Sequence, residues 1–409
     1  MISLGPMRVL VADRLFESSL DEMRTLGVDV SYEPELTASQ LPERLADINV
    51  LIVRGTEVTK AAFDAGSALN LVIRAGAGVQ NIDVATASER GIYVANCPGK
   101  NASAVAELTF TLIGCLDRRV PDGVASLRAG RWEKDEFARA VGLRGRALGI
   151  LGLGHVGRAV ARIAQAYDMP VYAWSRSFTS AKAAELGVTR VASPSELAKV
   201  SDIFSVHLDL TERTRGIVDR ALLSQLKPGA FFVNTARNEL VDYDALLEIA
   251  AQKSLRVGLD VLPSEPDTRS STYQHPILKS GLVYAVPHIG ASTDQAQLAI
   301  ANETVRILRS FLTKGEVPNV VNIAESSWSR YQLVVRHVDQ VGALANVLGV
   351  LKRHGINVQE LDNTVFEGAR AACAKIRVSS RPSDACLTEI MAFTGEVLHV
   401  DLVTLPNLA

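Results

Sequence analysis

Leu148-Gly-Ile-Leu-Gly-Leu-Gly-His-Val-Gly157 joins a short apolar run to three glycines spaced G-x-G-x-x-G. We interpret the apolar run as a β-strand and residues 158–166 as the helix that follows it. In a dinucleotide-binding unit the first glycine permits a tight turn, the second lets a pyrophosphate approach the backbone, and the third lets helix and strand pack closely. The helix N-terminus then faces the phosphates. The stretch therefore predicts a dinucleotide site formed by Gly152, Gly154, His155, Val156 and Gly157.

The next expected strand, residues 171–174, runs into Ser175-Arg176-Ser177. An acidic residue usually binds the adenosine ribose hydroxyls at this position, and none is present here. A guanidinium can bind a 2′-phosphate through two hydrogen bonds, whereas a carboxylate repels it. Ser175 and Arg176 therefore favour NADP over NAD as the cofactor. NAD stays acceptable if Arg176 stacks on adenine or points to solvent.

Strand-like runs alternate with helical patterns on both sides of this unit. Expected strands lie at 8–11, 28–30, 50–53, 71–74 and 92–94 before it, and at 171–174, 203–206, 230–233, 257–260 and 282–286 after it. Residues 101–119 form an expected long helix with Ser103 as its N-cap, and residues 293–312 form another. Such alternation predicts the α/β class, with parallel sheets covered by helices.

The last 80 residues follow a different pattern. Expected elements are a strand at 332–337, a helix at 341–353, strands at 356–365 and 371–378, a helix at 384–392 and a strand at 397–403. The order is βαββαβ, a ferredoxin-like layout. The first of these helices would place Val341, Leu344, Leu348 and Leu351 on one face. The polar stretch at 324–327 has the composition of a linker.

The composition is that of an ordinary globular chain. Of 409 residues, 47% are apolar and 22% are charged, and the formal net charge is −2. No global basic field points to nucleic acid, and no apolar run reaches the roughly 20 residues of a membrane span. The first residues lack the pattern of a signal peptide. Four widely spaced cysteines without a C-x-x-C pair indicate neither disulfides nor zinc. We expect a cytoplasmic protein with no metal, nucleic-acid partner or membrane association.

Three polar side chains follow expected strands of one sheet. Arg237, Glu265 and His288 each come shortly after such a strand, and the carboxyl ends of parallel strands meet at one edge. A protonated histidine can donate to a carbonyl oxygen as hydride reaches the carbon. A glutamate raises the pKa of that histidine, and an arginine binds a carboxylate bidentately. The set predicts the reduction of a 2-oxo acid, or the reverse reaction.

Several ordered motifs resemble those of the D-isomer-specific 2-hydroxyacid dehydrogenase family, and within it most closely the 3-phosphoglycerate dehydrogenases. They are Arg74-Ala-Gly-Ala-Gly-Val-Gln-Asn-Ile-Asp83, Asn96-Cys-Pro-Gly-Lys-Asn101, Leu151-Gly-Leu-Gly-His-Val-Gly157, Val233-Asn-Thr-Ala-Arg237, Gly258-Leu-Asp260 with Glu265-Pro266, and Pro287-His-Ile-Gly-Ala-Ser292. The resemblance covers nearly the whole chain and implies that Arg237, Glu265 and His288 form the catalytic triad.

The resemblance implies two doubly wound parallel-sheet domains and a smaller third one. Residues 1–97 and 288–322 would form a flavodoxin-like substrate-binding domain, into which a Rossmann-type dinucleotide-binding domain of residues 98–287 is inserted. Residues 323–329 would be a linker, and residues 330–409 an ACT-like regulatory domain.

The resemblance also implies roles outside the triad. The backbone amides of Ala75, Gly76, Ala77 and Gly78 would hold the substrate carboxylate, and Asn101 would contact substrate near the nicotinamide. Arg54 and Arg74 match residues that reach a substrate phosphate. His207, Thr235 and Asp260 match cofactor-side positions, with Asp260 approaching the carboxamide. Lys134 falls in a segment that crosses the dimer interface in the family, so a homodimer or homotetramer is expected.

The C-terminal pattern resembles an ACT domain, a module that often binds amino acids. His337, Asp339 and Asn357 match its effector positions, which makes serine a candidate effector. However, Val341 replaces the usual proline, and Asp339 stands where serine-binding versions tend to have asparagine. The alternative is an ACT-like domain that only supports oligomerisation.

Further departures concern the first part of the chain. Asn238 replaces the usual glycine after Arg237, and we expect the turn to survive because asparagine tolerates positive φ. Asp209 replaces a common proline, and we have no physical explanation for this difference.

The resemblance implies oxidation of 3-phosphoglycerate to 3-phosphohydroxypyruvate, or the reverse, on the route to L-serine. One alternative is a glyoxylate/hydroxypyruvate reductase, which Ser175 and Arg176 would suit. Another is a non-catalytic dinucleotide-sensing module.

Overall fold

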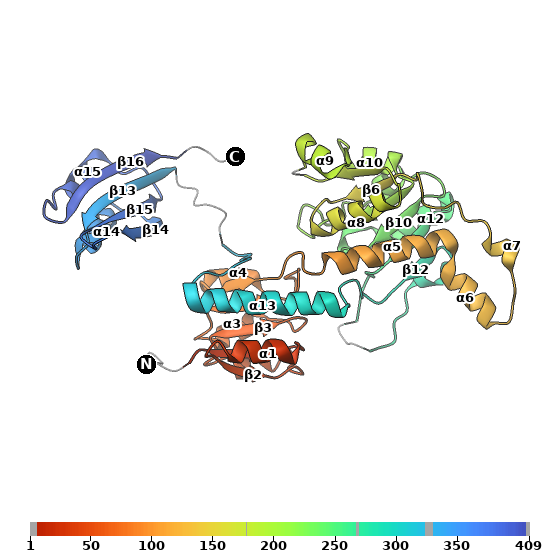
Figure 1. Ribbon diagram of the computed structural model, residues 1–409, viewed down its shortest axis with the longest axis horizontal. Helices are drawn as coiled ribbons and strands as arrows, with labels where there is room; N and C mark the ends of the chain where they lie inside the picture. The colour runs from red at the N-terminus through yellow and green to blue at the C-terminus, as the bar shows by residue number, and fades with distance from the viewer. Residues whose placement is uncertain (1–5, 177, 267–269, 324–329, 406–409) are drawn as a thin grey trace. The chain divides into compact units, whose positions relative to one another are not determined.

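The computed structural model describes residues 6–176, 178–266, 270–323 and 330–405. Ser177 and the expected linker at 324–327 lie outside the described residues. The chain forms two compact units, which divide between Asn322 and Ile323. The first unit contains two parallel sheets and the second contains one antiparallel sheet (Figure 1).

The N-terminal sheet is built from short apolar strands. Its order is β2-β1-β3-β4-β5, all parallel, with β1 (Arg8–Val11), β2 (Asp29–Tyr32), β3 (Val50–Val53), β4 (Leu71–Arg74) and β5 (Tyr93–Ala95). All four residues of β3 are buried, as expected for a central parallel strand covered on both faces. The covering helices are α1 (Glu17–Arg24), α2 (Leu41–Arg44), α3 (Lys60–Ala65), α4 (Val84–Glu89) and α13 (Asp294–Lys314).

The second parallel sheet carries the glycine turn. Its order is β12-β11-β10-β9-β6-β7-β8, with β6 (Leu148–Leu151), β7 (Val171–Trp174), β8 (Thr189–Arg190), β9 (Ile203–Val206), β10 (Phe231–Asn234), β11 (Arg256–Leu259) and β12 (Val283–Ala285). The chain moves outward from β6 to β8 and then restarts at β9 on the other side of β6. Ligands bind at such a reversal in open α/β sheets, which positions the glycine turn.

Helices cover both faces of this second sheet. On one face, α5 (Ala102–Arg118) packs against α8 (His155–Ala166), and both contribute to one apolar core. The other face is covered by α10 (Pro194–Val200), α11 (Arg220–Leu223) and α12 (Tyr243–Lys253). The remaining elements are α6 (Val120–Arg128), α7 (Lys134–Phe137), α9 (Ser180–Leu186), η1 (Asn238–Leu240) and η2 (Pro276–Lys279). The predicted α/β class is confirmed.

The C-terminal unit has the predicted order βαββαβ. Its elements are β13 (Tyr331–Val338), α14 (Ala343–Arg353), β14 (Val358–Val365), β15 (Ala371–Val378), α15 (Asp384–Met391) and β16 (Val397–Thr404). The sheet order is β14-β15-β13-β16, with every pair antiparallel. Leu333, Val335 and Ile376 are fully buried and pack in one core with side chains of both helices.

Local expectations at helix ends were wrong in three places. The N-cap of α5 is Asn101 rather than Ser103, and its side chain makes no capping bond. Helix α8 begins at His155, because Gly154 is its N-cap. Helix α14 begins at Ala343, after Gly342 has turned through φ 95°. Val341 is therefore outside the helix and fully exposed rather than on its buried face.

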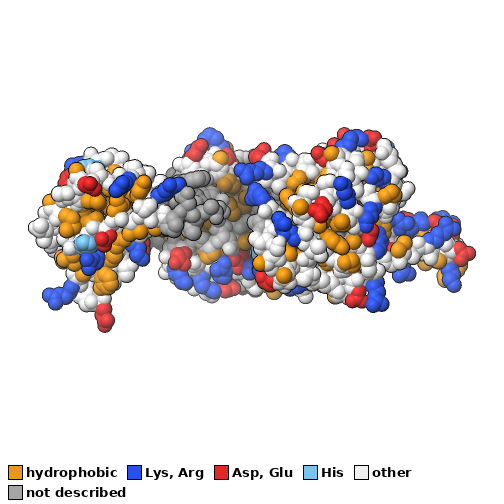
Figure 2. Space-filling view, turned by 90° about the horizontal axis from the view of Figure 1, so that it is seen from above, with side chains coloured by type: hydrophobic (Ala, Val, Ile, Leu, Met, Phe, Trp, Pro, Cys, Tyr) orange, Lys and Arg blue, Asp and Glu red, His pale blue; other side chains and the backbone are white. Residues whose placement is uncertain are grey.

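The described residues show neither a membrane-crossing helix nor a metal cluster. No helix among them is long and apolar enough to span a bilayer. No group of three or more of their His, Cys, Asp and Glu side chains is placed to hold a metal ion. On the face seen in Figure 2, basic and acidic side chains are interspersed.

Candidate active site

The glycine turn leaves one side open for a ligand. Gly152 has φ 103°, and a Cβ there would lie 2.6 Å from the carbonyl oxygen of His207. A Cβ on Gly157 would lie 2.1 Å from the carbonyl oxygen of Gly152, so α8 packs directly onto the turn. A Cβ on Gly154 would meet nothing within 4 Å. His155 and Val156 lie in the first turn of α8, where N–H groups have no intrahelical partners. These residues fit a pyrophosphate at the helix N-terminus.

The end of β7 lies beside this turn. The N–H of Gly152 donates to the carbonyl oxygen of Trp174 at 2.8 Å, so Ser175 and Arg176 follow at the edge of the turn. Arg176 is exposed and Ser175 is half-buried. A basic side chain therefore stands where an adenosine ribose would lie next to β7.

His207 and Thr235 lie at the carboxyl ends of β9 and β10. Nε2 of His207 is 2.7 Å from Oγ of Ser205, whereas Nδ1 is buried without a hydrogen-bond partner. Burial lowers the pKa of His207 to about 3, so the ring is neutral. Oγ1 of Thr235 is 2.9 Å from Oγ1 of Thr109 on α5. The structure thus places both predicted cofactor-side residues at the same sheet edge as the glycine turn.

His288 and Glu265 form a hydrogen-bonded pair. Nδ1 of His288 is 2.7 Å from Oε2 of Glu265, and Oε1 of Glu265 accepts from the N–H of Leu262 at 2.7 Å. The hydrogen bond to Glu265 raises the pKa of His288, against the opposing effect of burial. Burial also acts to raise the pKa of Glu265, but the hydrogen bond and charge of His288 lower it overall. The pair therefore favours a protonated imidazole facing an ionised carboxylate.

Asp260 holds the segment that carries His288. Its Oδ1 accepts from the N–H of Ile289 at 2.7 Å, and its Oδ2 accepts from the N–H of Gly290 at 3.0 Å. The N–H of His288 donates to the carbonyl oxygen of Asp260 at 2.9 Å. These bonds keep His288 at φ 51°, a left-handed conformation that is uncommon for histidine. Burial raises the pKa of Asp260.

Arg237 extends toward the loop that follows β4. A Cβ on Gly78 would lie 2.7 Å from Nη2 of Arg237, so the guanidinium sits against the backbone of that loop. Nη1 of Arg237 donates to the carbonyl oxygen of Ala236 at 2.6 Å. The structure thus brings an arginine that follows a strand of the second sheet to the Ala75–Gly78 segment of the first, which the family resemblance implies to be a carboxylate-binding loop.

Asn234 and Tyr243 support Arg237 and were not assigned from the sequence. Nδ2 of Asn234 donates to the carbonyl oxygen of Arg237 at 2.9 Å and to the hydroxyl of Tyr243 at 3.3 Å. Asn234 is fully buried. A polar residue at the buried end of an apolar strand requires partners, and that rule was a signal available in the sequence.

The structure corrects the expectation for Asn238. It does not adopt positive φ but begins the short helix η1, while Arg237 is extended at φ −142°. The turn therefore needs no glycine at position 238, because the chain enters η1 directly.

The loop after β4 is fixed by its neighbours. The N–H of Cys97 donates to the carbonyl oxygen of Gly76 at 2.9 Å, and Nδ2 of Asn96 donates to that of Ala77 at 2.5 Å. The guanidinium of Arg74 folds over Gly76, where a Cβ would collide with it. Asn101 is half-buried at the start of α5, a few residues after this anchoring segment.

Arg74 is one of a group of mutually repelling guanidiniums. Burial, followed by the charges of Arg237 and Arg54, lowers the pKa of Arg74 to about 10. Its Nε is buried without a hydrogen-bond partner. The charges of Arg237 and Arg54 disfavour the charge of Arg74, so an anion would be stabilised in this region.

The predicted effector residues do not converge within one chain. His337 is buried, and its Nε2 is 3.0 Å from Oδ1 of Asn363 on β14, a residue not assigned from the sequence. Asp339 is exposed. Asn357 precedes β14 and bonds with Ser379, beyond the end of β15 that is remote from His337. Asn357 therefore lies away from His337 within this unit, and the role of the three residues in effector binding stays a prediction.

Lys134 begins α7, in a segment with exposed apolar side chains. Leu127 is 56% exposed and Trp132 is 81% exposed. These residues, together with Val124, Lys134 and Phe137, line a depression of about 440 Å³ between α6 and α7. An exposed apolar surface of this kind is typical of a protein–protein contact.

Comparison with known proteins places these features in a family. The model of the D-isomer specific 2-hydroxyacid dehydrogenase NAD binding domain matches residues 110–290. D-3-phosphoglycerate dehydrogenase of Methanocaldococcus jannaschii is 34% identical over 342 residues, which are 82% of this chain and 64% of that protein. The chain therefore spans less than two thirds of the length of this relative. Hydroxypyruvate reductase of Thermotoga maritima is 38% identical over 272 residues, which are 66% of this chain and 87% of that protein.

A solved structure shows the same fold. The crystal structure of a glyoxylate reductase from Paecilomyes thermophila aligns with a TM-score of 0.70 and 28% identity, covering 78% of this chain and 99% of that one. The sequence matches point to the same family as the glycine turn and the parallel sheets. The chain belongs to the D-isomer specific 2-hydroxyacid dehydrogenase family.

Proposed function

We propose that this protein is a nicotinamide-dependent D-2-hydroxyacid dehydrogenase. The observation that carries the proposal is the His288–Glu265 pair, 2.7 Å apart, on the same sheet as an open glycine turn and with Arg237 against Gly78. An acid–base group, a carboxylate-binding arginine and a dinucleotide turn are the parts that reversible oxidation of a 2-hydroxy acid requires.

The roles of the residues follow from their contacts. A bound nicotinamide cofactor supplies or accepts the hydride. In reduction, protonated His288 donates a proton to the carbonyl oxygen of the substrate, and in oxidation neutral His288 accepts the hydroxyl proton. Glu265 keeps the imidazole oriented and stabilises its protonated form. The N–H groups of Ala75 and Gly76 donate to the carbonyl oxygens of Val53 at 2.7 Å and Arg74 at 2.8 Å, so the prediction that they bind substrate is wrong. Arg237 and the backbone amides of Ala77 and Gly78 bind the substrate carboxylate and polarise the adjacent carbonyl.

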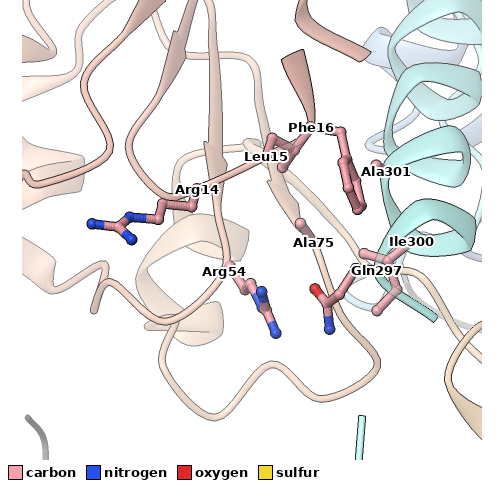
Figure 3. Close-up of a pocket in the computed structure, with 8 residues that line it drawn as sticks. All are labelled: Arg14, Leu15, Phe16, Arg54, Ala75, Gln297, Ile300 and Ala301. Atoms are coloured by element: carbon pink, nitrogen blue, oxygen red, sulfur yellow. The ribbon is translucent and has the colours of Figure 1, made fainter. Parts of the chain in front are cut away.

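We propose 3-phosphoglycerate and 3-phosphohydroxypyruvate, on the route to L-serine, as the substrate pair. A pocket of about 200 Å³ adjoins Ala75 and is lined by Arg14, Leu15, Phe16, Arg54, Ala75, Gln297, Ile300 and Ala301. In Figure 3, Arg54 and Gln297 extend in the same direction on either side of Ala75, while Arg14 points away. Arg54 and Arg74 supply positive charge for a phosphate, and the relative from Methanocaldococcus jannaschii is named for this activity.

A glyoxylate/hydroxypyruvate reductase is the second candidate. It is favoured by Ser175 and Arg176 at the end of β7, where NADP would find a cation rather than an acid. The relative from Thermotoga maritima is named hydroxypyruvate reductase. NADP over NAD stays a prediction, as does a cytoplasmic location.

A steady-state comparison tests both candidates. The full chain is assayed with 3-phosphoglycerate and either NAD or NADP, and with hydroxypyruvate and glyoxylate and either reduced cofactor. We expect the highest kcat/KM for the phosphorylated pair. A higher value for hydroxypyruvate with NADPH supports the second candidate. Negligible turnover of every combination, together with measurable cofactor binding, would favour the dinucleotide-sensing module and contradict the enzyme proposal.

Replacement of Glu265 by glutamine should shift the pH profile to lower pH. Glu265 raises the pKa of His288 above its ordinary value, so the protonated form needed for reduction persists to higher pH. Without that carboxylate the pKa of His288 falls. As the pH is raised, the rate of reduction therefore declines at a lower pH than in the wild-type enzyme. Oxidation, which needs neutral His288, gains its active form at lower pH. The measurement is kcat/KM against pH in both directions.

A matched control is available in the C-terminal unit. His354 pairs with Glu389 at 2.8 Å, so Glu389→Gln removes a similar histidine partner from a unit that does not contain the proposed triad. That variant should leave both pH profiles unchanged. An unchanged profile in Glu265→Gln would show that Glu265 does not set the charge of the acid–base group.

We also propose a homodimer or homotetramer and an amino-acid effector. The exposed apolar residues of α6 and α7 around Lys134 support self-association. The ferredoxin-like C-terminal unit supports an ACT-like regulatory role, with His337 buried near the end of β13 and bonded to Asn363. Isothermal titration with serine tests the effector, and no heat at millimolar serine would leave the unit with a role in oligomerisation only.

A further inference from the structure

Asp13 is a buried carboxylate without a role in the proposed mechanism. It follows β1 and is 8% exposed. Its Oδ2 accepts hydrogen bonds from the backbone N–H groups of Arg54 at 2.7 Å, Gly55 at 3.0 Å and Thr56 at 2.9 Å. One oxygen atom thus fixes three successive N–H groups of the loop after β3, and that loop carries Arg54.

The fixed loop borders the pocket next to Ala75. Arg54 lines that pocket, as do Leu15 and Phe16, which follow Asp13 in the chain. Asp13 also lies close enough to Arg74 to favour its charged form, whereas Arg54 and Arg237 disfavour it. Asp13 is therefore both a structural anchor of the anion-binding region and a countercharge to it.

We propose that Asp13 is a positioning residue that sets specificity for a second acidic group on the substrate. By holding the N–H groups of residues 54–56, it keeps the guanidinium of Arg54 at the pocket, where that group binds a phosphate on the carbon chain of the substrate. The inference rests on the proposed function and adds the residue on which its selectivity depends.

Asp13 has two opposing effects on the binding of an anionic substrate, one through its charge and one through its hydrogen bonds. The negative charge of Asp13 weakens the attraction of the arginines for an anion, while its hydrogen bonds keep Arg54 in place. Displacement of a binding group by 1 Å can cost on the order of 10²-fold in rate. We expect positioning to exceed the countercharge effect, because all three bonds fall on the loop that presents Arg54.

The test compares Asp13→Ala with Asp13→Asn in the full chain. Asp13→Ala should raise the KM for 3-phosphohydroxypyruvate on the order of 10- to 100-fold. The value of kcat/KM for hydroxypyruvate, which lacks the phosphate, should change less than about threefold. Asp13→Asn keeps an amide oxygen for the three N–H groups, so its KM should stay within about threefold of wild type.

A control and four outcomes decide the proposal. Asp83 caps α4 and accepts from the N–H of Thr86 at 3.0 Å, so Asp83→Ala should lower the Tm without changing the ratio of kcat/KM for the two substrates.

Tighter binding of the phosphorylated substrate by Asp13→Asn would show that the countercharge dominates and would overturn the proposal, even if Asp13→Ala does not fold. Equal losses for both substrates in Asp13→Ala would also overturn it. Wild-type protein that reduces hydroxypyruvate but does not prefer the phosphorylated substrate contradicts the inference and the proposed substrate pair, but not the proposed dehydrogenase activity. Wild-type protein that turns over neither of these substrates nor glyoxylate contradicts the proposed function itself.

Discussion

Replacement of His288 by asparagine is expected to lower kcat about 10²- to 10⁴-fold, because general acid–base catalysis contributes a factor of that size. Asparagine cannot exchange a proton with the substrate oxygen near neutral pH. The KM for the cofactor should change little, since the glycine turn is formed by other residues. Steady-state kinetics in both directions with saturating cofactor provide the measurement.

The matched control for this variant is His354→Asn. His354 also pairs with a glutamate, at 2.8 Å from Glu389, but it lies in the C-terminal unit. The control should retain wild-type kcat. A His288→Asn enzyme with more than about a tenth of wild-type kcat would fall outside the range of acid–base catalysis and would remove His288 from the mechanism.

Replacement of Arg237 by glutamine should lower kcat/KM for the 2-oxo acid about 10²- to 10³-fold, the usual cost of removing one preorganised charge-stabilising donor. Arg237 lies against the backbone of Gly78, and in the proposed mechanism it binds the substrate carboxylate there. Both kcat and KM should change. Arg237→Lys should recover only part of the loss, because an ammonium group cannot form the bidentate contact.

The pH profile gives this variant a second readout. Arg237 lowers the pKa of His288, so its removal should move the acid–base limb to higher pH, opposite to the shift in Glu265→Gln. Arg220→Gln removes an arginine of helix α11 that pairs with Glu248 at 2.7 Å on the surface, and it should leave both readouts unchanged. A full-activity Arg237→Gln enzyme would exclude Arg237 from substrate binding.

Much of the site could be predicted from the sequence because it follows local rules. Gly152 and Gly154 lie between an apolar strand and a helix, Gly157 lies in the first turn of that helix, and each has the close contact or open side that its position requires. Glu265 and His288 follow neighbouring strands β11 and β12, whose carboxyl ends meet in any parallel sheet. The two side chains therefore converge without information about distant parts of the chain.

The predictions of where helices begin were wrong at positions where residue type and spacing only weakly determine the helix start. Ser103 is a good N-cap residue by type, but α5 begins at Ala102 after an Asn101 that makes no capping bond. Val341 fits the apolar face of a helix by spacing, yet the left-handed Gly342 delays the start of α14. Single residues at helix ends depend on the path of the preceding loop, which periodicity does not describe.

By itself the sequence determined the α/β class, the βαββαβ tail and the glycine turn, because hydrophobic periodicity and glycine spacing act over a few residues. The assignment of the triad also needed the resemblance of several ordered motifs to a known family, and it stays a prediction. Only the tertiary structure decided which distant segments meet. It brings Arg237 to Gly78, ties Asp13 to the N–H groups after Val53, and separates Asn357 from His337. Such contacts arise from the order of strands in a sheet and the packing of one sheet's loops on another. Those arrangements are set by the burial of whole faces, a property of the complete chain rather than of any short stretch.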